Sequence, residues 1–264
     1  NDPWQGTGHL NDCSIVRPIF KGNRLIAFAA TASHMPDIGG RIRSVEAREI
    51  FEEGFHIPLM KILRAGEADQ TFFELLRTQV RTPEQTEGDI YAQITANYLI
   101  EDRVLAMLGE YGLEDLAALS LELNGRTEAA MRAAIREVPD GIYEYEMQTD
   151  GLAAGAPFTF ALKLTVRGET IHFDFAGTSA VQPRAINCPF CYTYAMSAYA
   201  IKCALLPDIP NNSGMLRPIT VEAPENSLLN PLPPASVGAR ASTGHYVPIL
   251  AFGALAAVMP ERVM

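Results

Sequence analysis

A short pattern that occurs twice near the start of this chain constrains its fold and function more than any other feature. His9-Leu-Asn-Asp12 has a second copy in His34-Met-Pro-Asp37, and each copy places an imidazole and a carboxylate three positions apart. Two apolar runs, 13–20 and 25–32, lie between the copies, and a Lys-Gly-Asn-Arg break separates the runs. Apolar runs around a Gly-Asn break predict a β-hairpin.

This hairpin would bring the two copies of the pattern together. In an antiparallel pair, the residue that enters the first strand lies beside the residue that leaves the second. Two imidazoles and one carboxylate commonly hold a divalent first-row ion and leave positions open for water or substrate. We therefore interpret His9, Asp12 and His34 as ligands of a divalent metal ion, Mn, Zn or Fe. The alternative is that these side chains only cap turns in Gly-rich loops.

Two further carboxylates are expected beside this cluster. Asp2 precedes the first copy of the pattern and Asp37 ends the second. Histidines that bind a metal need an acceptor for their other ring N–H, and a nearby carboxylate often supplies it. Asp37 is also a candidate base that takes a proton from water during hydrolysis.

The loop 237–245 carries two candidate catalytic groups, Arg240 and His245. Small residues fill most of this loop and permit close approach of the backbone, yet it holds two long polar side chains. A histidine can give a proton to a leaving nitrogen, and a guanidinium can bind a carboxylate or phosphate bidentately. We predict that both lie at the rim of the same pocket. The alternatives are a helix-capping contact for Arg240 and a core histidine for His245.

The remaining sequence predicts an α+β protein of three regions. Residues 1–68 form the metal-site hairpin region, in which the Glu-rich run 44–53 predicts a short helix with a solvated face. Residues 69–138 show helical periodicity and predict a helical subdomain, including a helical hairpin after Pro83, suited to packing or a partner interface. Residues 139–264 alternate with period two and then turn helical at 190–205, so they predict a mixed αβ region that completes the pocket.

Composition narrows the possible partners. The chain has 264 residues, 48% of them hydrophobic, and a formal net charge of −10. Nucleic acids and anionic membranes bind basic surfaces, so this balance excludes both as partners. The apolar stretches are too short to span a bilayer, and we predict a cytoplasmic location.

Motifs along the whole chain resemble the hydantoinase B/oxoprolinase family, which includes subunits of N-methylhydantoinases, 5-oxoprolinase and the acetone and acetophenone carboxylases. The motifs read NDPW at 1–4, GHLND at 8–12, SHMPDIGG at 33–40, EEG at 52–54, DFAGTS at 174–179, INCP at 186–189, PNNSG at 210–214 and VGARASTGH at 237–245. The family's chains are about twice as long as this one, so the chain is expected to be a fragment of a longer protein.

The resemblance implies a subunit of a hydrolase that cleaves a cyclic amide, such as a hydantoin, 5-oxoproline or a lactam. It also implies a hetero-oligomer with a hydantoinase A-like subunit that binds ATP. The sequence has no Gly-x-x-x-x-Gly-Lys-Ser/Thr motif, which agrees with nucleotide binding in the partner. Two alternatives stay open: an ATP-dependent ketone carboxylase subunit with the same site, and a non-catalytic scaffold for the nucleotide-binding subunit.

Asp174 and Cys188 are further candidates for lining the pocket. Asp174 ends a predicted strand just before a Gly-Thr-Ser loop. Cys188 belongs to a single CxxC pair with Cys191, and a structural zinc would need a second pair. We interpret these thiols mainly as buried packing groups, with Cys188 kept as a pocket candidate because it lies in a motif of the family.

Overall fold

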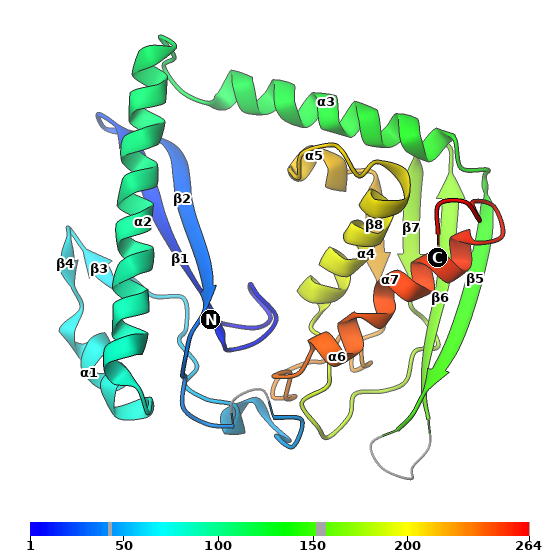
Figure 1. The fold of residues 1–264 in the computed structure, drawn as a ribbon, viewed down its shortest axis with the longest axis horizontal. Coiled ribbons are helices and arrows are strands. Elements are labelled where there is room, and N and C mark those ends of the chain that lie inside the picture. Colours follow the sequence, from blue (N-terminus) through cyan, green and yellow to red (C-terminus); the bar gives the residue numbers. More distant parts are fainter. Residues whose placement is uncertain (42–43, 152–156, 264) are drawn as a thin grey trace.

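The structure of the chain is a computed structural model that describes residues 1–41, 44–151 and 157–263, and it has an α+β fold. In Figure 1, an N-terminal half that contains the hairpin and α2 faces a C-terminal half built on a larger sheet, and α3 crosses between them. The strands are β1 (Asp12–Lys21), β2 (Arg24–His34), β3 (Leu63–Arg64), β4 (Glu67–Ala68), β5 (Gly141–Thr149), β6 (Phe158–Arg167), β7 (Thr170–Asp174) and β8 (Ile219–Glu222). The helices are the 3-10 helix η1 (Ile50–Glu52), α1 (Gln70–Gln79), α2 (Pro83–Glu110), α3 (Ala117–Arg136), α4 (Phe190–Leu205), α5 (Ser213–Leu216), α6 (Ala241–Gly244) and α7 (Tyr246–Leu255).

The predicted β-hairpin is confirmed: β1 and β2 pair antiparallel, with Asp12 opposite His34. Gly22 occupies the turn at φ +62°, a backbone conformation that favours glycine. One face of the hairpin packs on α2 and buries residues such as Ile19, whereas the other face exposes apolar side chains such as Phe28. The hairpin is therefore anchored to the protein mainly through α2.

A first hydrophobic core lies between the hairpin, α1 and α2. Val237, from near the other end of the chain, is completely buried in this core. Segment 231–240 therefore crosses from the C-terminal half into the N-terminal half. The buried members from the N-terminal half include Leu10, Met35, Ile38, Phe73, Leu76 and Ile90.

The predicted helical hairpin does not form, although α1, α2 and α3 occupy the predicted helical region. The chain turns at Gly112, with φ +62°, and α3 then runs to the C-terminal half, where it packs on α5, α4 and β7. The apolar face of α3 explains this direction. Met131 and Ile135 on that face are completely buried in the core of the C-terminal half.

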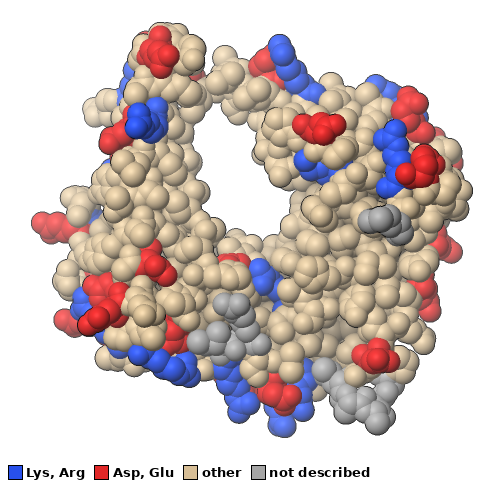
Figure 2. All heavy atoms as spheres, in the orientation of Figure 1, with Lys and Arg blue, Asp and Glu red and all other residues tan. Residues whose placement is uncertain are grey.

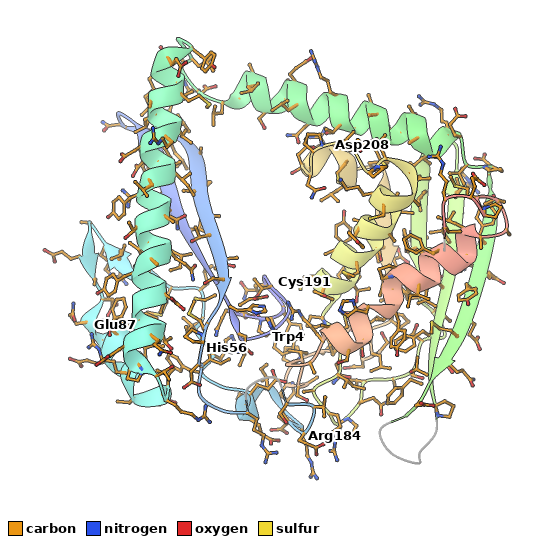
Figure 3. All side chains as sticks on the ribbon, viewed as in Figure 1. Trp4, His56, Glu87, Arg184, Cys191 and Asp208 are labelled. Carbon is orange, nitrogen blue, oxygen red and sulfur yellow. The ribbon has the colours of Figure 1, made fainter. Side chains whose placement is uncertain are left out.

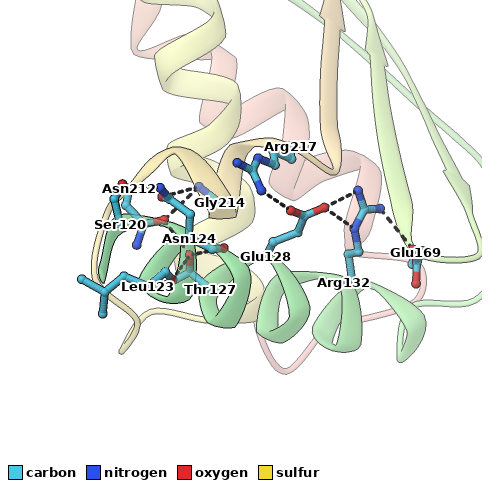
Figure 4. A network of polar contacts seen from close by, with 10 residues as sticks. All are labelled: Ser120, Leu123, Asn124, Thr127, Glu128, Arg132, Glu169, Asn212, Gly214 and Arg217. Atoms are coloured by element: carbon cyan, nitrogen blue, oxygen red, sulfur yellow. Dashed lines mark hydrogen bonds and ion pairs between the residues drawn. The ribbon is translucent and has the colours of Figure 1, made fainter. Parts of the chain in front are cut away.

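A polar network fastens α3 to α5 (Figure 4). Thr127 donates its hydroxyl to Oδ1 of Asn212 at 2.5 Å, and the amide of Gly214 donates to the same atom at 2.9 Å. A Cβ on Gly214 would overlap the carbonyl oxygen of Asn124, so this close contact requires glycine. The 210–214 motif thus serves packing between helices. Ion pairs extend the network along α3 through Glu128, Arg132, Glu169 and Arg217.

The predicted second sheet is confirmed. Strands β5, β6 and β7 form an antiparallel meander, and β8 adds to β7 in parallel, with Ile171 opposite Ile219. The predicted helix at 190–205 is α4, which packs with α7 on this sheet around the second core.

The protein thus has two hydrophobic cores, one in each half. Helices from 69–138 contribute to both cores, and the division into regions 1–68, 69–138 and 139–264 stays a prediction. Figure 2 shows an opening between the two halves, with most charged atoms on the outer surface. Within the described residues, no helix has both the length and the hydropathy that crossing a membrane requires.

Candidate metal centre

His9, Asp12 and His34 meet at the open end of the β1–β2 hairpin. The antiparallel register puts Asp12 opposite His34, and His9 belongs to the turn that leads into β1. His9 Nδ1 lies 3.2 Å from Asp12 Oδ2, and His34 Nε2 lies 2.8 Å from Asp12 Oδ1. One ligand atom of each side chain lies within 4.8 Å of the others. The structure therefore brings the three predicted ligands together, and their binding of a metal stays a prediction.

The cluster is graded from buried to exposed. The side chain of His9 is only 3% exposed, that of Asp12 is 15% exposed, and that of His34 is 53% exposed. The chain keeps this arrangement because the hairpin pairing continues past its last strand residue: the amide of Met35 donates to the carbonyl of Asn11 at 2.7 Å. A small molecule would approach the cluster from the side of His34.

Arg240 reaches the same cluster from the other end of the chain. Its Nη2 donates to Asp12 Oδ2 at 2.9 Å, and its guanidinium carbon lies 4.5 Å from the centre of the Tyr192 ring. Gly8, at φ +89°, makes room for this side chain, because a Cβ there would lie 2.7 Å from Arg240 Nε. The structure thus brings Arg240 to the pocket of the predicted ligands.

The electrostatics of the cluster favour an ionised Asp12. Burial raises the pKa of this carboxyl, but its contact with His9 and the charges of Arg240 and His34 outweigh burial, so the pKa is lowered overall. His9 Nδ1 and Arg240 Nε are buried without a hydrogen-bond partner in the part of the chain that the structure describes. Buried polar atoms without partners are costly, and they mark a place where a ligand would be stabilised.

The spacing of the cluster fits a divalent first-row ion. Such an ion holds nitrogen and oxygen ligands at roughly 2.0–2.2 Å, so two ligands at a right angle are about 3 Å apart. The contacts of Asp12 with the two imidazoles, at 3.2 and 2.8 Å, are close to this value. Three protein ligands also leave coordination positions open, as in catalytic rather than structural sites.

The structure does not bring Asp37 to this cluster. Its Oδ1 accepts the amide of Gly39 at 2.9 Å and Nη1 of Arg81 at 2.9 Å, and its Oδ2 accepts the Arg81 amide. Burial raises the pKa of Asp37, but these hydrogen bonds outweigh it and lower the pKa overall. Asp37 therefore fastens the loop after β2 to the start of α2, and both of its oxygens are already used.

Asp2 and Asp174 also hold local contacts. Asp2 accepts the amide of Trp4 at 2.8 Å and lies 3.5 Å from Nε2 of His56, so it organises the turn at the start of the chain. Figure 3 shows Trp4 and His56 near the junction of the two halves. Asp174 pairs with Lys163 at 3.0 Å on the larger sheet. The described group of metal-type ligands contains neither carboxylate.

The two remaining candidates flank α6. Cys188 is completely buried, and burial raises the pKa of its thiol to about 12. A Cβ on Gly244 would lie 3.3 Å from its sulfur, so Cys188 packs beneath α6. His245 follows α6 and is exposed, without a side-chain hydrogen bond to the residues that the structure describes. Its role as general acid stays a prediction.

Two residues near the cluster were missed in the sequence. Tyr192 carries the guanidinium of Arg240 on its ring, and no local pattern marks this tyrosine. Glu53 lies in the Glu-rich run predicted as a solvated helix, but only η1 forms there, and Glu53 is 3% exposed. The prediction of a solvated face was wrong here, because the carboxylate turns inward to accept two amides of segment 231–240.

The whole chain, residues 1–264, matches the family model described as Hydantoinase B/oxoprolinase. The chain belongs to this family. Among the relatives of this Hydantoinase B/oxoprolinase chain is a putative D-/L-hydantoinase component from a Pseudomonas species, which is 33% identical over 279 residues covering 100% of this chain and 47% of the relative. A second relative, the beta component of the caprolactamase of Pseudomonas jessenii, is 29% identical over 246 residues covering 89% of this chain and 41% of the relative. The chain therefore spans less than half the length of these relatives.

Two solved structures share the fold of this Hydantoinase B/oxoprolinase chain. The ATP-dependent caprolactamase from Pseudomonas jessenii matches with a TM-score of 0.90 at 28% identity, covering 99% of this chain and 46% of that one. The nucleotide-free acetone carboxylase matches with a TM-score of 0.88 at 18% identity, covering 99% and 37%, and this likeness shows the fold alone. The α+β fold and the resemblance to the family are confirmed.

Proposed function

We propose that this chain belongs to a subunit of a metal-dependent hydrolase that cleaves a C–N bond of a cyclic amide. The observation that carries the proposal is the cluster of His9, Asp12 and His34 with Arg240 held on Asp12. The names of the relatives agree with this substrate class, since they include a hydantoinase subunit, a caprolactamase subunit and 5-oxoprolinases. We infer a hydantoin, a lactam or 5-oxoproline as the substrate.

The three ligands would hold a divalent ion, Mn, Zn or Fe. When bound, such an ion supplies Lewis-acid polarisation of a carbonyl oxygen and activation of water. Asp12 orients both imidazoles, because one of its oxygens faces His9 and the other faces His34. The exposed side of His34 leaves an approach for the substrate ring, whereas buried His9 anchors the cluster in the protein.

Arg240 supplies a binding site for an anionic group beside the ion. One amino group of its guanidinium is used by Asp12, while Nε has no partner among the described residues. A guanidinium binds a carboxylate or phosphate strongly in such a partly buried position. Arg240 would therefore orient a substrate carboxylate, or a phosphoryl group on an activated substrate.

His245 is the proposed proton donor to the leaving nitrogen. It lies one helical turn beyond Arg240 in the chain, at the end of α6, and its ring is exposed to solvent. An exposed imidazole exchanges protons near neutral pH, as a general acid requires. Asp37 takes no part in this mechanism, because both of its oxygens already accept hydrogen bonds from Gly39 and Arg81.

The partner in this proposal is a hydantoinase A-like subunit that binds ATP, within a cytoplasmic hetero-oligomer. Two relatives are named as subunits, and one similar structure is that of an ATP-dependent caprolactamase. The absence of a Gly-x-x-x-x-Gly-Lys-Ser/Thr motif from the sequence agrees with nucleotide binding on a different subunit.

A second candidate is an ATP-dependent ketone carboxylase with the same site. The fold similarity to acetone carboxylase favours it, but the sequence identity of 18% is lower than the 28% shared with caprolactamase. Cyclic-amide hydrolysis is therefore the better supported reaction.

Metal analysis of the purified protein tests the proposal. We expect about one divalent ion per chain, loss of this ion in His9→Ala/His34→Ala, and retention in the control His172→Ala, whose ring bonds to Thr220 on the larger sheet. Activity with the partner, ATP and hydantoin, lactam or 5-oxoproline should follow the metal content. A metal-free protein whose double mutant keeps full activity and stability would instead support the scaffold alternative.

A further inference from the structure

Glu53 is a buried acidic residue that connects the two halves of the protein. It follows η1 in the N-terminal half, and 3% of its surface is exposed. Its Oε1 accepts the amide of Val237 at 2.6 Å and the amide of Gly238 at 2.7 Å. Both donors lie in segment 231–240, which crosses from the C-terminal half.

The packing around this carboxylate is close. A Cβ on Gly238 would lie 3.2 Å from both the carboxyl carbon and Oε1 of Glu53, so the glycine backbone rests on the carboxyl group. On the other side, the backbone of Gly40 meets that of Glu53 so closely that a Cβ on Gly40 would overlap it. The carboxylate is thus held from two sides and has little freedom to move.

The turn that Glu53 holds leads directly to Arg240. The amide of Arg240 donates to the carbonyl of Val237 at 2.9 Å, and the amide of Ala239 donates to the carbonyl of Ala185 at 2.8 Å. Segment 237–240 is therefore tied to the N-terminal half by Glu53 and to the C-terminal half by Ala185. Without Glu53, two buried amides would lose their acceptor, and the turn before Arg240 would be held from one half only.

We propose that Glu53 is a positioning residue that holds Arg240 against Asp12 by binding the Val237–Gly238 turn. This inference deepens the proposed function, because it names the residue that sets the anion-binding group of the same site. Misplacement of such a group by about 1 Å is enough to weaken a catalytic arrangement.

Few charges surround Glu53. Glu52 precedes it and pairs with Arg41 at 3.3 Å, and Arg240 on the bound segment directs its guanidinium to Asp12. Oε2 of Glu53 is buried without a partner among the described residues. The geometry therefore requires an acceptor of the length of Glu at this position, which an uncharged glutamine also provides.

Hydrogen exchange tests this inference without metal, partner or substrate. The exchange rates of the Val237 and Gly238 amides and of the Arg240 Nε–H are measured by NMR in three variants. Glu53→Asp shortens the reach of the carboxylate, Glu53→Gln keeps the acceptor, and Glu52→Gln is the control at the neighbouring position. We expect about tenfold faster exchange of all three protons in Glu53→Asp, since a hydrogen bond is lost. Glu53→Gln and Glu52→Gln should exchange like the natural protein.

Each other outcome overturns the inference. Unchanged Arg240 Nε–H exchange in Glu53→Asp, with faster amide exchange, would mean that the turn is held without positioning Arg240. Unchanged exchange of all three protons would mean that Glu53 does not hold the turn. Equally fast exchange in Glu53→Gln would show that an acceptor at this position is not what matters. Because these rates are independent of catalysis, a failure of the proposed function leaves the result interpretable.

Discussion

The burial of Glu53 predicts an unusual dependence of stability on pH. Burial raises the pKa of this carboxyl to about 7, although the amides of Gly238 and Val237 lower it, and an ordinary glutamate has a value of 4.5. A carboxyl with a raised pKa in the folded state binds its proton more tightly there than in the unfolded chain. Its contribution therefore favours folding at low pH and is lost as the pH rises from about 4.5 to 7.

The size of this effect follows from the two pKa values. A difference of one pKa unit corresponds to about 1.4 kcal/mol, so ionisation of Glu53 should lower the free energy of unfolding by about 3 kcal/mol between pH 4.5 and pH 8. This is a large part of the 5–15 kcal/mol that typically stabilises a folded protein. Glu53→Gln removes the ionisation but keeps an acceptor for both amides, so its stability should lack this component.

Urea unfolding at several pH values measures the effect. The free energy of unfolding of the natural protein minus that of Glu53→Gln should fall by about 3 kcal/mol from pH 4.5 to pH 8. Other groups, such as Asp12 and Asp37 with their lowered pKa values, contribute to both proteins and cancel in the difference. Parallel curves for the two proteins over this range would refute the reasoning, because they would mean that Glu53 ionises as easily in the folded protein as in water.

Three substitutions test other contacts by thermal unfolding. Gly8→Ala should destabilise the protein by about 1–3 kcal/mol, because the residue has φ +89° and a Cβ would press on Arg240; an unchanged melting temperature would contradict this contact. Asp37→Ala should destabilise by about 3 kcal/mol, because Arg81 and two buried amides lose their acceptor, while metal content stays unchanged; loss of metal would restore Asp37 to the site. Gly214→Ala should destabilise by about 2 kcal/mol or more through the α3–α5 contact, and normal stability would show that α3 is fastened elsewhere.

Local patterns in the sequence predicted the elements that local interactions decide. Alternating apolar runs around Gly22 predicted the hairpin, and its register then placed Asp12 opposite His34. The helix at 190–205 was predicted with the bounds that the structure shows, because its apolar residues and flanking prolines are all local signals.

The sequence did not reveal where polar side chains find distant partners. Asp37 repeats the pattern of Asp12, yet its nearest partner is Arg81, on the helix that covers the other side of the loop. Glu53 looks like its exposed neighbours until its acceptors and the Val237 turn are seen together. Such choices depend on contacts between residues far apart in the chain, which periodicity does not describe.

The direction of α3 was missed for a related reason. Its apolar stripe predicted a helix, but a stripe does not specify which of two cores will cover it. Met131 and Ile135 fit the core of the larger sheet, and α3 therefore crosses the protein. A helical hairpin was the simpler expectation for two helices joined by a short loop.

The contact between Arg240 and Asp12 joins residues that are 228 positions apart in the chain, whereas the two imidazoles and Asp12 come from one hairpin. A hairpin closes within about 1–10 μs, and distant contacts form later because the intervening chain must first become ordered. During synthesis, the ribosome has also completed the hairpin before it reaches Arg240. The cation-binding part of the site thus precedes its anion-binding part in time, and a newly made chain is able to take up its ion before the arginine arrives to compete for Asp12.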